Sequence, residues 1–359
     1  MQIINKLFRY KDVYIFFILK VIFIFFFSTI FLHANSFKVT DIEVSSPFEL
    51  DFNKNKVIDD GFKVSFYNLI SIITTSGDKD KIKNISLKEL KGMIDSFAIK
   101  EERFVNDEYF AKLEVTFNKK NIFSFLEKKN IFPSIPIKNK ILLIPILVDL
   151  ESENIYLFDK NVFYQKWNED IKNYHLLEYL LPSEDLEDLS IIQKNYNTIE
   201  DYNFLDLVRK YDLEDYIIVI LFKDKNDLKV HSKINFKDSF KVDNQIYQKV
   251  NLDDEKNFQL ILDNLKKNYE DYWKKDNEIN TSIKLPITIS IDSKKYDKIE
   301  KLEKKINNID LVSDFYVLKF DNNNIFFRII FNGSPKIFLN YMNENDFELK
   351  MENNIWKIK

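Results

Sequence analysis

The side chains that could bind a transition metal are few and scattered along the chain. Only three histidines occur, at His33, His175 and His231, and the chain has no cysteine. Transition-metal sites need several converging ligands, usually held in short motifs such as H-x-x-x-H, and no such motif is present. We therefore predict no metal site at these residues and interpret His175 and His231 as surface or helix-end residues.

One carboxylate cluster, comprising Glu184, Asp185, Glu187 and Asp188, could attract calcium, which prefers several oxygen ligands. Its spacing does not follow the D-x-D-x-D-G pattern of a calcium loop. Acidic side chains are also typical of the first turn of a helix, so we interpret the cluster as a solvated helix start. The stretch Asp321–Asn324 could likewise ligate a cation, but a hairpin turn explains it fully.

Motifs for nucleophilic or phosphate chemistry are absent from the sequence. No G-x-S-x-G occurs, and four glycines in all exclude the usual phosphate-cradling loops. Trp167, Trp273 and Trp356 fall on predicted apolar faces, so we expect them in the core. We predict no catalytic residue, no cofactor and no enzymatic activity, although two carboxylates brought together by the fold could form an acid/base pair.

The first 36 residues have the pattern of a leader that directs export. Four basic residues precede the unbroken apolar run Val21–Leu32, and the small residues Ala34 and Ser36 follow it. A basic start, an apolar centre and a small-residue exit are typical of a signal peptide. We predict cleavage after Ser36, so that Phe37 begins the mature chain in the periplasm.

The alternative is an uncleaved inner-membrane anchor over Val13–Leu32, since a spanning helix needs about 20 apolar residues. Lys20 interrupts that longer run, and a charge at mid-membrane costs about 2.5–3.5 kcal/mol. The cleaved leader is therefore favoured. Because the chain has no cysteine, a lipid-modified N-terminal cysteine is excluded.

The charge of the chain gives no reason to expect binding to nucleic acid or to an anionic membrane. The whole chain carries a net charge of −4, and its basic residues are interleaved with acidic ones. Nucleic-acid binding proteins instead concentrate Lys and Arg in a basic patch. The 359-residue chain is longer than one compact core usually serves, so we expect two or three domains.

Residues 37–132 predict a small strand-helix-hairpin-helix module. Alternating apolar residues indicate strands, a broad apolar face indicates a helix, and Asn118 can cap the final helix. The predicted elements are Phe37–Val44, Val57–Ile73, and the hairpin arms Phe97–Val105 and Tyr109–Phe117. Pro133 and Pro136 mark the linker that follows.

Residues 139–276 predict a two-layer α/β middle domain. Two continuous apolar runs, Ile141–Leu150 and Tyr216–Phe222, are typical of strands covered on both faces, although Pro145 favours an edge, a bulge or a strand end. The other predicted elements are helices at Asn161–Asn173, Tyr202–Tyr211 and Asp253–Lys275, and a polar-faced hairpin of Leu228–Phe236 and Phe240–Val250.

Residues 283–359 predict a C-terminal split-βαβ, or ferredoxin-like, module with an extra terminal strand. The predicted strands are Ile283–Ile291, Val312–Phe320, Ile325–Phe331, Phe347–Met351 and Ile355–Ile358, with a helix capped by Ser334. The whole chain is thus a mixture of α/β and α+β modules. Because modules of this size have small cores, we expect the end modules to dock on the middle domain or on a partner.

Three short blocks and a tryptophan carry a resemblance to a known family. They are FLHANSFKVTDIEV at Phe31–Val44, YFAKLEVTF at Tyr109–Phe117, ILLIPILVD at Ile141–Asp149, and Trp167 downstream. The chain resembles the domain-of-unknown-function 2066 family of exported proteins from Gram-negative bacteria. The resemblance implies an exported envelope protein and covers nearly all of the mature chain. It assigns no catalytic residue.

These observations favour a non-enzymatic periplasmic adaptor or assembly factor for cell-envelope proteins. Edge strands of split-βαβ modules can accept a strand from an envelope protein partner. The alternative is a periplasmic protein that binds or senses a small ligand, with a pocket between modules. An enzyme is the third hypothesis. The sequence predicts no nucleic-acid partner and membrane contact only through an uncleaved leader, and it leaves the oligomeric state open.

Overall fold

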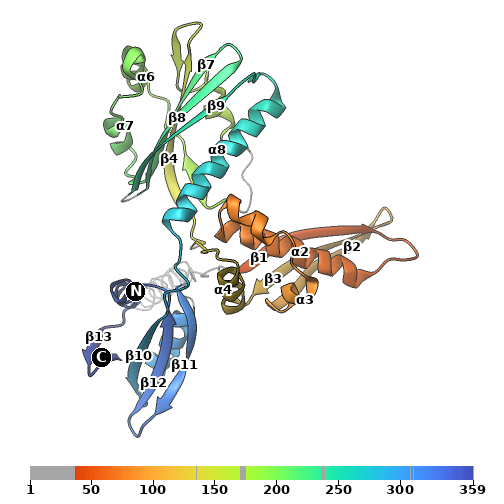
Figure 1. Cartoon of the computed structure of the whole chain (residues 1–359), viewed down its shortest axis with the longest axis vertical. Helices are drawn as coiled ribbons and strands as arrows, with labels where there is room; N and C mark the ends of the chain where they lie inside the picture. Colours follow the sequence, from red (N-terminus) through yellow and green to blue (C-terminus); the bar gives the residue numbers. More distant parts are fainter. Residues whose placement is uncertain are drawn as a thin grey trace, which may run out of the picture. The chain divides into compact units, whose positions relative to one another are not determined.

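The computed structural model describes residues 37–134, 136–169, 175–236, 239–307, 309 and 311–358. Three β-sheets follow one another along this part of the chain, each with its own helices, in a mixed α/β and α+β fold (Figure 1). The predicted fold class is therefore confirmed. Of the predicted cleavage residues, Ala34 and Ser36 lie outside the described residues, as do His33 and the apolar run before it.

The first sheet is antiparallel with the strand order β1-β3-β2. Its elements are β1 (Lys38–Pro47), α2 (Lys54–Ile73), a 3-10 helix (Ser76–Ile82), α3 (Leu87–Lys91), β2 (Ile94–Val105), β3 (Glu108–Phe117) and α4 (Lys119–Lys128). The hairpin turns on Asn106 and Asp107, with φ of 53° and 58°, as tight two-residue hairpin turns require. Asn118 caps α4 by accepting a hydrogen bond from the backbone N–H of Asn121 at 3.0 Å, as predicted.

The middle sheet has the order β5-β4-β7-β8-β9, and β6 also pairs with β4. Its elements are β4 (Asn139–Asp149), β5 (Asn154–Tyr156), α5 (Val162–Lys166), β6 (Leu177–Leu180), α6 (Leu186–Lys194), a 3-10 helix (Tyr196–Thr198), α7 (Leu205–Arg209), β7 (Tyr216–Asp224), β8 (Asp227–Phe236), β9 (Ser239–Tyr247) and α8 (Glu255–Asp276). Helices α5 and α8 pack on one face, and α6 and α7 cover the other. The sheet therefore has a helical layer on each side, one layer more than predicted.

Pro145 lies inside β4, which is an internal strand of the sheet. Along its outer side, β4 pairs with β6 only as far as Leu142 and with β5 only from Leu147 onward. Pro145 falls in the gap between these two short partners, so its missing N–H removes no bond from a continuous ladder. The proline thus marks a break between neighbouring strands.

Two helices of the middle domain differ from their predicted extent. Helix α5 ends at Lys166, well before Asn173, and residues 170–174 lie outside the described residues. Helix α7 begins at Leu205, which is exposed, and it buries Leu207 and Val208. Short helices carry too few turns for periodicity to define their buried face.

The third sheet has the order β11-β12-β10-β14-β13. Its elements are β10 (Leu285–Asp292), α9 (Tyr296–Asn307), β11 (Val312–Phe320), β12 (Asn324–Phe331), α10 (Pro335–Glu344), β13 (Leu349–Glu352) and β14 (Ile355–Ile358). Ser334 caps α10 as predicted. The last strand, β14, inserts between β10 and β13 and runs parallel to β10.

Hydrogen bonds connect the segments that carry the three sheets. Lys274 of α8 donates to the carbonyl oxygen of Ser71 at the end of α2, at 2.6 Å. Lys284, just before β10, forms an ion pair with Glu127 of α4 at 3.1 Å. The first and third sheets also contribute to one continuous cluster of buried apolar side chains. The first module thus contacts the middle domain, as expected, whereas these contacts of the third module are with the first module, which the sequence did not predict.

None of the helices in the described part of the chain has both the length and the apolar composition that a membrane span needs.

Candidate partner-binding surface

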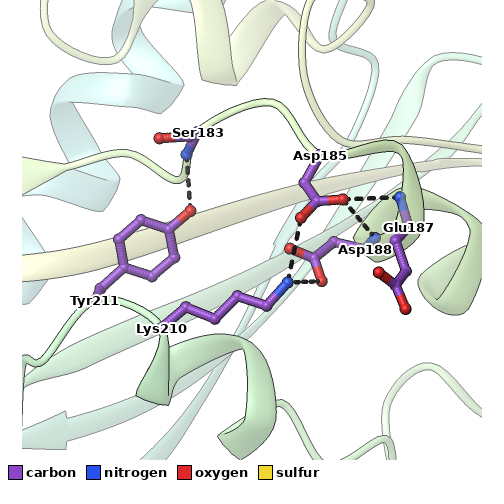
Figure 2. Close-up of polar contacts among 6 residues, drawn as sticks. All are labelled: Ser183, Asp185, Glu187, Asp188, Lys210 and Tyr211. Carbon is purple, nitrogen blue, oxygen red and sulfur yellow. Dashed lines mark hydrogen bonds and ion pairs between the residues drawn. The ribbon is translucent and has the colours of Figure 1, made fainter.

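The carboxylate cluster near residue 185 is organised as a helix cap and an ion pair. Asp185 accepts hydrogen bonds from the backbone N–H groups of Glu187 and Asp188, at 2.8 and 3.4 Å. Lys210 lies between the carboxylates of Asp185 and Asp188, at 3.2 and 2.6 Å (Figure 2). The N–H of Glu187, followed by the Lys210 ammonium, lowers the pKa of Asp185 below its usual value. The predicted helix start is thus confirmed, but the cluster is not fully solvated, because Asp188 is buried.

Among the described residues, no group of three or more His, Asp or Glu side chains converges in a way that could hold a metal ion. We therefore expect about 1 mM CaCl₂ or an equal concentration of EDTA to leave the thermal midpoint unchanged within about 1 °C. A site with a Kd of about 10 µM would instead stabilise the fold by about 2.7 kcal/mol at that concentration. Differential scanning fluorimetry measures this directly, and a calcium-dependent rise of several degrees would contradict it.

The other polar candidates have structural roles. Asp321 accepts hydrogen bonds from the backbone N–H groups of Asn323 and Asn324, at 2.8 and 2.6 Å, which closes the predicted hairpin turn. Nδ1 of His231 in β8 lies 2.8 Å from the side-chain oxygen of Asn244 in β9. His175, just before β6, lines a cavity described below.

The tryptophans lie where the sequence places them. Trp167 is fully buried and stacks on Tyr269, and Trp273 is buried against Phe236. Trp356 is half-buried against the core shared by the first and third sheets. These roles are those of core side chains.

Phe37, the predicted first residue after cleavage, is buried. Its ring packs edge-on against Phe123, with centroids 5.5 Å apart, and its carbonyl oxygen accepts a hydrogen bond from the N–H of Phe117 at 2.8 Å. The predicted cleavage point thus directly precedes a residue that belongs to the core of the first sheet.

Strand β9 carries the candidate surface, and its inward face is fixed by α8. Tyr272 of α8 donates its hydroxyl to Asp243 at 3.0 Å, and Lys241 forms an ion pair with Asp276. Tyr247 packs on the same core, and burial, followed by the charge of Asp243, raises its pKa to about 12. Figure 1 shows α8 lying across the sheet that contains β9.

The opposite face of β9 is exposed and largely apolar, with Asn244 as its polar member. Phe240, Val242 and Ile246 alternate with the residues that face α8, and they are 59%, 49% and 65% exposed. We call these three side chains the β9 surface. Their cross-strand neighbours on β8 are polar, so the apolar stripe is confined to the sheet margin.

The outer edge of β9 has no strand partner in the described part of the chain, because β9 ends the strand order of its sheet. An edge strand presents unpaired backbone N–H and C=O groups, and exposed apolar side chains beside such an edge favour pairing with another strand. The sequence predicts this hairpin but not this surface, since alternation alone leaves open which face of an edge strand is covered.

No family model matches the chain, and a search of curated proteins finds no similar protein. The resemblance to the family of exported envelope proteins therefore stays a prediction.

Proposed function

We propose that this protein is an exported, non-enzymatic adaptor or assembly factor of the cell envelope, which binds an extended segment of a protein partner along β9. The single observation that supports the proposal is the β9 surface beside an unpaired strand edge. Its export rests on the leader pattern of residues 1–36.

The chemistry of the surface defines the partner segment. A strand added to β9 would form backbone hydrogen bonds along the edge, and every second side chain would lie on the bare face. The segment should therefore carry apolar residues at alternate positions, to extend the stripe formed by Phe240, Val242 and Ile246. The side chains on its other face would lie beside Lys241 and Asp243 and could be polar.

A photo-crosslinking side chain at Val242 tests the proposal in the native envelope. We expect it to capture one protein through an extended apolar-alternating peptide, and Phe240→Lys to reduce that crosslink about tenfold or more. Loss of an apolar interface anchor typically costs 2 kcal/mol or more, and 1.4 kcal/mol is tenfold in affinity. Leu260→Lys is the matched control, because Leu260 is 62% exposed but lies on α8.

The control variant should crosslink like the wild type. Equal loss in both variants, or no change with Phe240→Lys, would exclude β9 as the docking edge. Capture of a second copy of this chain as the sole product would show a self-association surface and would overturn the adaptor role.

A further inference from the structure

A cavity of about 180 Å³ that is lined by several charged side chains lies along α8. Its charged lining comes mainly from α8, with Asp263, Lys267, Glu270, Asp271 and Lys274, and Lys79 of the 3-10 helix after α2 adds to it. A water molecule in the liquid takes up about 30 Å³, so the cavity has the volume of about six waters and can hold a small organic molecule of that size.

Glu270 is the unusual residue of this lining. Its side chain is almost completely buried, with 4% of the residue exposed. One carboxylate oxygen accepts hydrogen bonds from the backbone N–H groups of Leu176 and Leu177, at 2.9 and 2.8 Å, and the other has no hydrogen-bond partner among the residues that the structure describes. Buried polar atoms are nearly always paired, so this oxygen is poised to accept a donor from a bound molecule.

The remaining carboxylates of the cavity are already paired within the protein. Both oxygens of Asp271 accept hydrogen bonds from Ser76, at 2.7 Å from the backbone N–H and 2.5 Å from the hydroxyl. Asp263 accepts a hydrogen bond from Gln259 at 3.0 Å. Glu270 is thus the carboxylate that would receive a cationic group of a ligand.

Three lysines, Lys79, Lys267 and Lys274, also line this cavity. Lys274 uses one of its three N–H donors on the carbonyl oxygen of Ser71. Burial lowers the pKa values of Lys79 and Lys274, although the nearby carboxylates, Asp271 for Lys79 and Glu270 and Asp271 for Lys274, act in the opposite direction. The lining thus carries lysine and carboxylate charges of both signs, and a bound anionic group would be stabilised beside the lysines.

We propose that this cavity binds a free α-amino acid as a zwitterion. Its ammonium group would donate to the unpaired oxygen of Glu270, and its carboxylate would lie among Lys79, Lys267 and Lys274. A simple anion would leave the Glu270 oxygen unpaired, and a simple amine would face the three lysines. The inference goes beyond the adaptor role and does not depend on it.

Isothermal titration of the purified protein with each of the twenty amino acids tests the site, with acetate and methylamine as probes of each charge alone. We expect a subset of amino acids to bind and Glu270→Gln to weaken them at least tenfold. Glu178→Gln, an exposed substitution of the same kind on β6, should bind like the wild type. Lys267→Met, at an exposed position, should weaken binding severalfold, and it serves as the deciding variant if Glu270→Gln does not fold.

Absence of binding by all twenty amino acids overturns the proposal. Unchanged affinity in Glu270→Gln, or in Lys267→Met where that variant decides, overturns it as well. Binding of acetate or methylamine as tight as that of any amino acid would show that a zwitterion is not the ligand.

Discussion

Replacing Asn161 with alanine is expected to lower the free energy of unfolding by about 3 kcal/mol. Asn161 is fully buried between β4 and α5. Its side-chain oxygen caps α5 by accepting hydrogen bonds from the N–H groups of Phe163 and Tyr164, at 3.0 and 3.4 Å. Its amide group donates to the carbonyl oxygens of Pro145 and Tyr156, at 3.0 and 3.2 Å.

The size of the effect follows from the gap beside Pro145. In the described part of the chain, no strand pairs with the outer side of β4 at this point, so the Pro145 carbonyl depends on a side-chain donor. Alanine removes a helix cap, worth about 1 kcal/mol. It also leaves the buried Pro145 carbonyl and the part-buried Tyr156 carbonyl without this donor, at about 1 kcal/mol each.

Urea unfolding followed by tryptophan fluorescence measures the loss. Asn118→Ala is the matched control, since Asn118 caps α4 with one hydrogen bond to Asn121 and does not bridge two carbonyls. We expect the control to lose about 1 kcal/mol. Asn161→Asp keeps the capping oxygen but points a carboxylate at two carbonyl oxygens, so it should be at least as unstable as alanine at neutral pH. Equal losses at Asn161 and Asn118 would show that the bridge contributes nothing.

Local sequence patterns predict many elements of this fold. The alternation from Ile283 to Ile291 predicts β10, and the acids and lysines at the two ends of Asp253–Lys275 mark the limits of α8 within a few residues. The turn at Asn106 and Asp107 is equally local, because these residues tolerate positive φ. Such signals need only a residue and its near neighbours.

Features decided by distant parts of the chain could not be read in this way. Strand β14 inserts beside β10, although nothing in its four residues distinguishes that place from the sheet edge. The outward direction of Phe240 and Ile246 depends on α8 covering the other face of β9.

The charged cavity could not be predicted from the sequence for the same reason. Lys266, Glu270 and Lys274 repeat every four residues on α8, a spacing shared by ordinary solvated helix faces. The fold nevertheless buries all three. Their burial becomes visible only when the elements that pack on α8 are placed.

Replacing Gly61 with alanine is expected to destabilise the fold by about 1–2 kcal/mol, although alanine is the better helix former. Gly61 lies in the middle of α2 and faces the first sheet. A Cβ atom there would overlap Cδ1 of Leu113 and lie 3.5 Å from Cγ1 of Val44. The helix would gain about 1 kcal/mol from alanine, but overpacking costs about 1–3 kcal/mol. Leu113 is fully buried, so its side chain would have to shift within the core to admit the Cβ atom, and overpacking should dominate.

Gly77→Ala is the matched control, because a Cβ atom at Gly77 would meet nothing within 4 Å. It should be neutral or stabilise the protein by up to about 1 kcal/mol. A double-mutant cycle with Leu113→Ala then identifies the cause. If the overlap is responsible, Gly61→Ala should cost less in the Leu113→Ala background than in the wild type, with a coupling of about 1 kcal/mol. An additive cycle, or a stabilising Gly61→Ala, would show that α2 does not need a glycine to approach the sheet this closely.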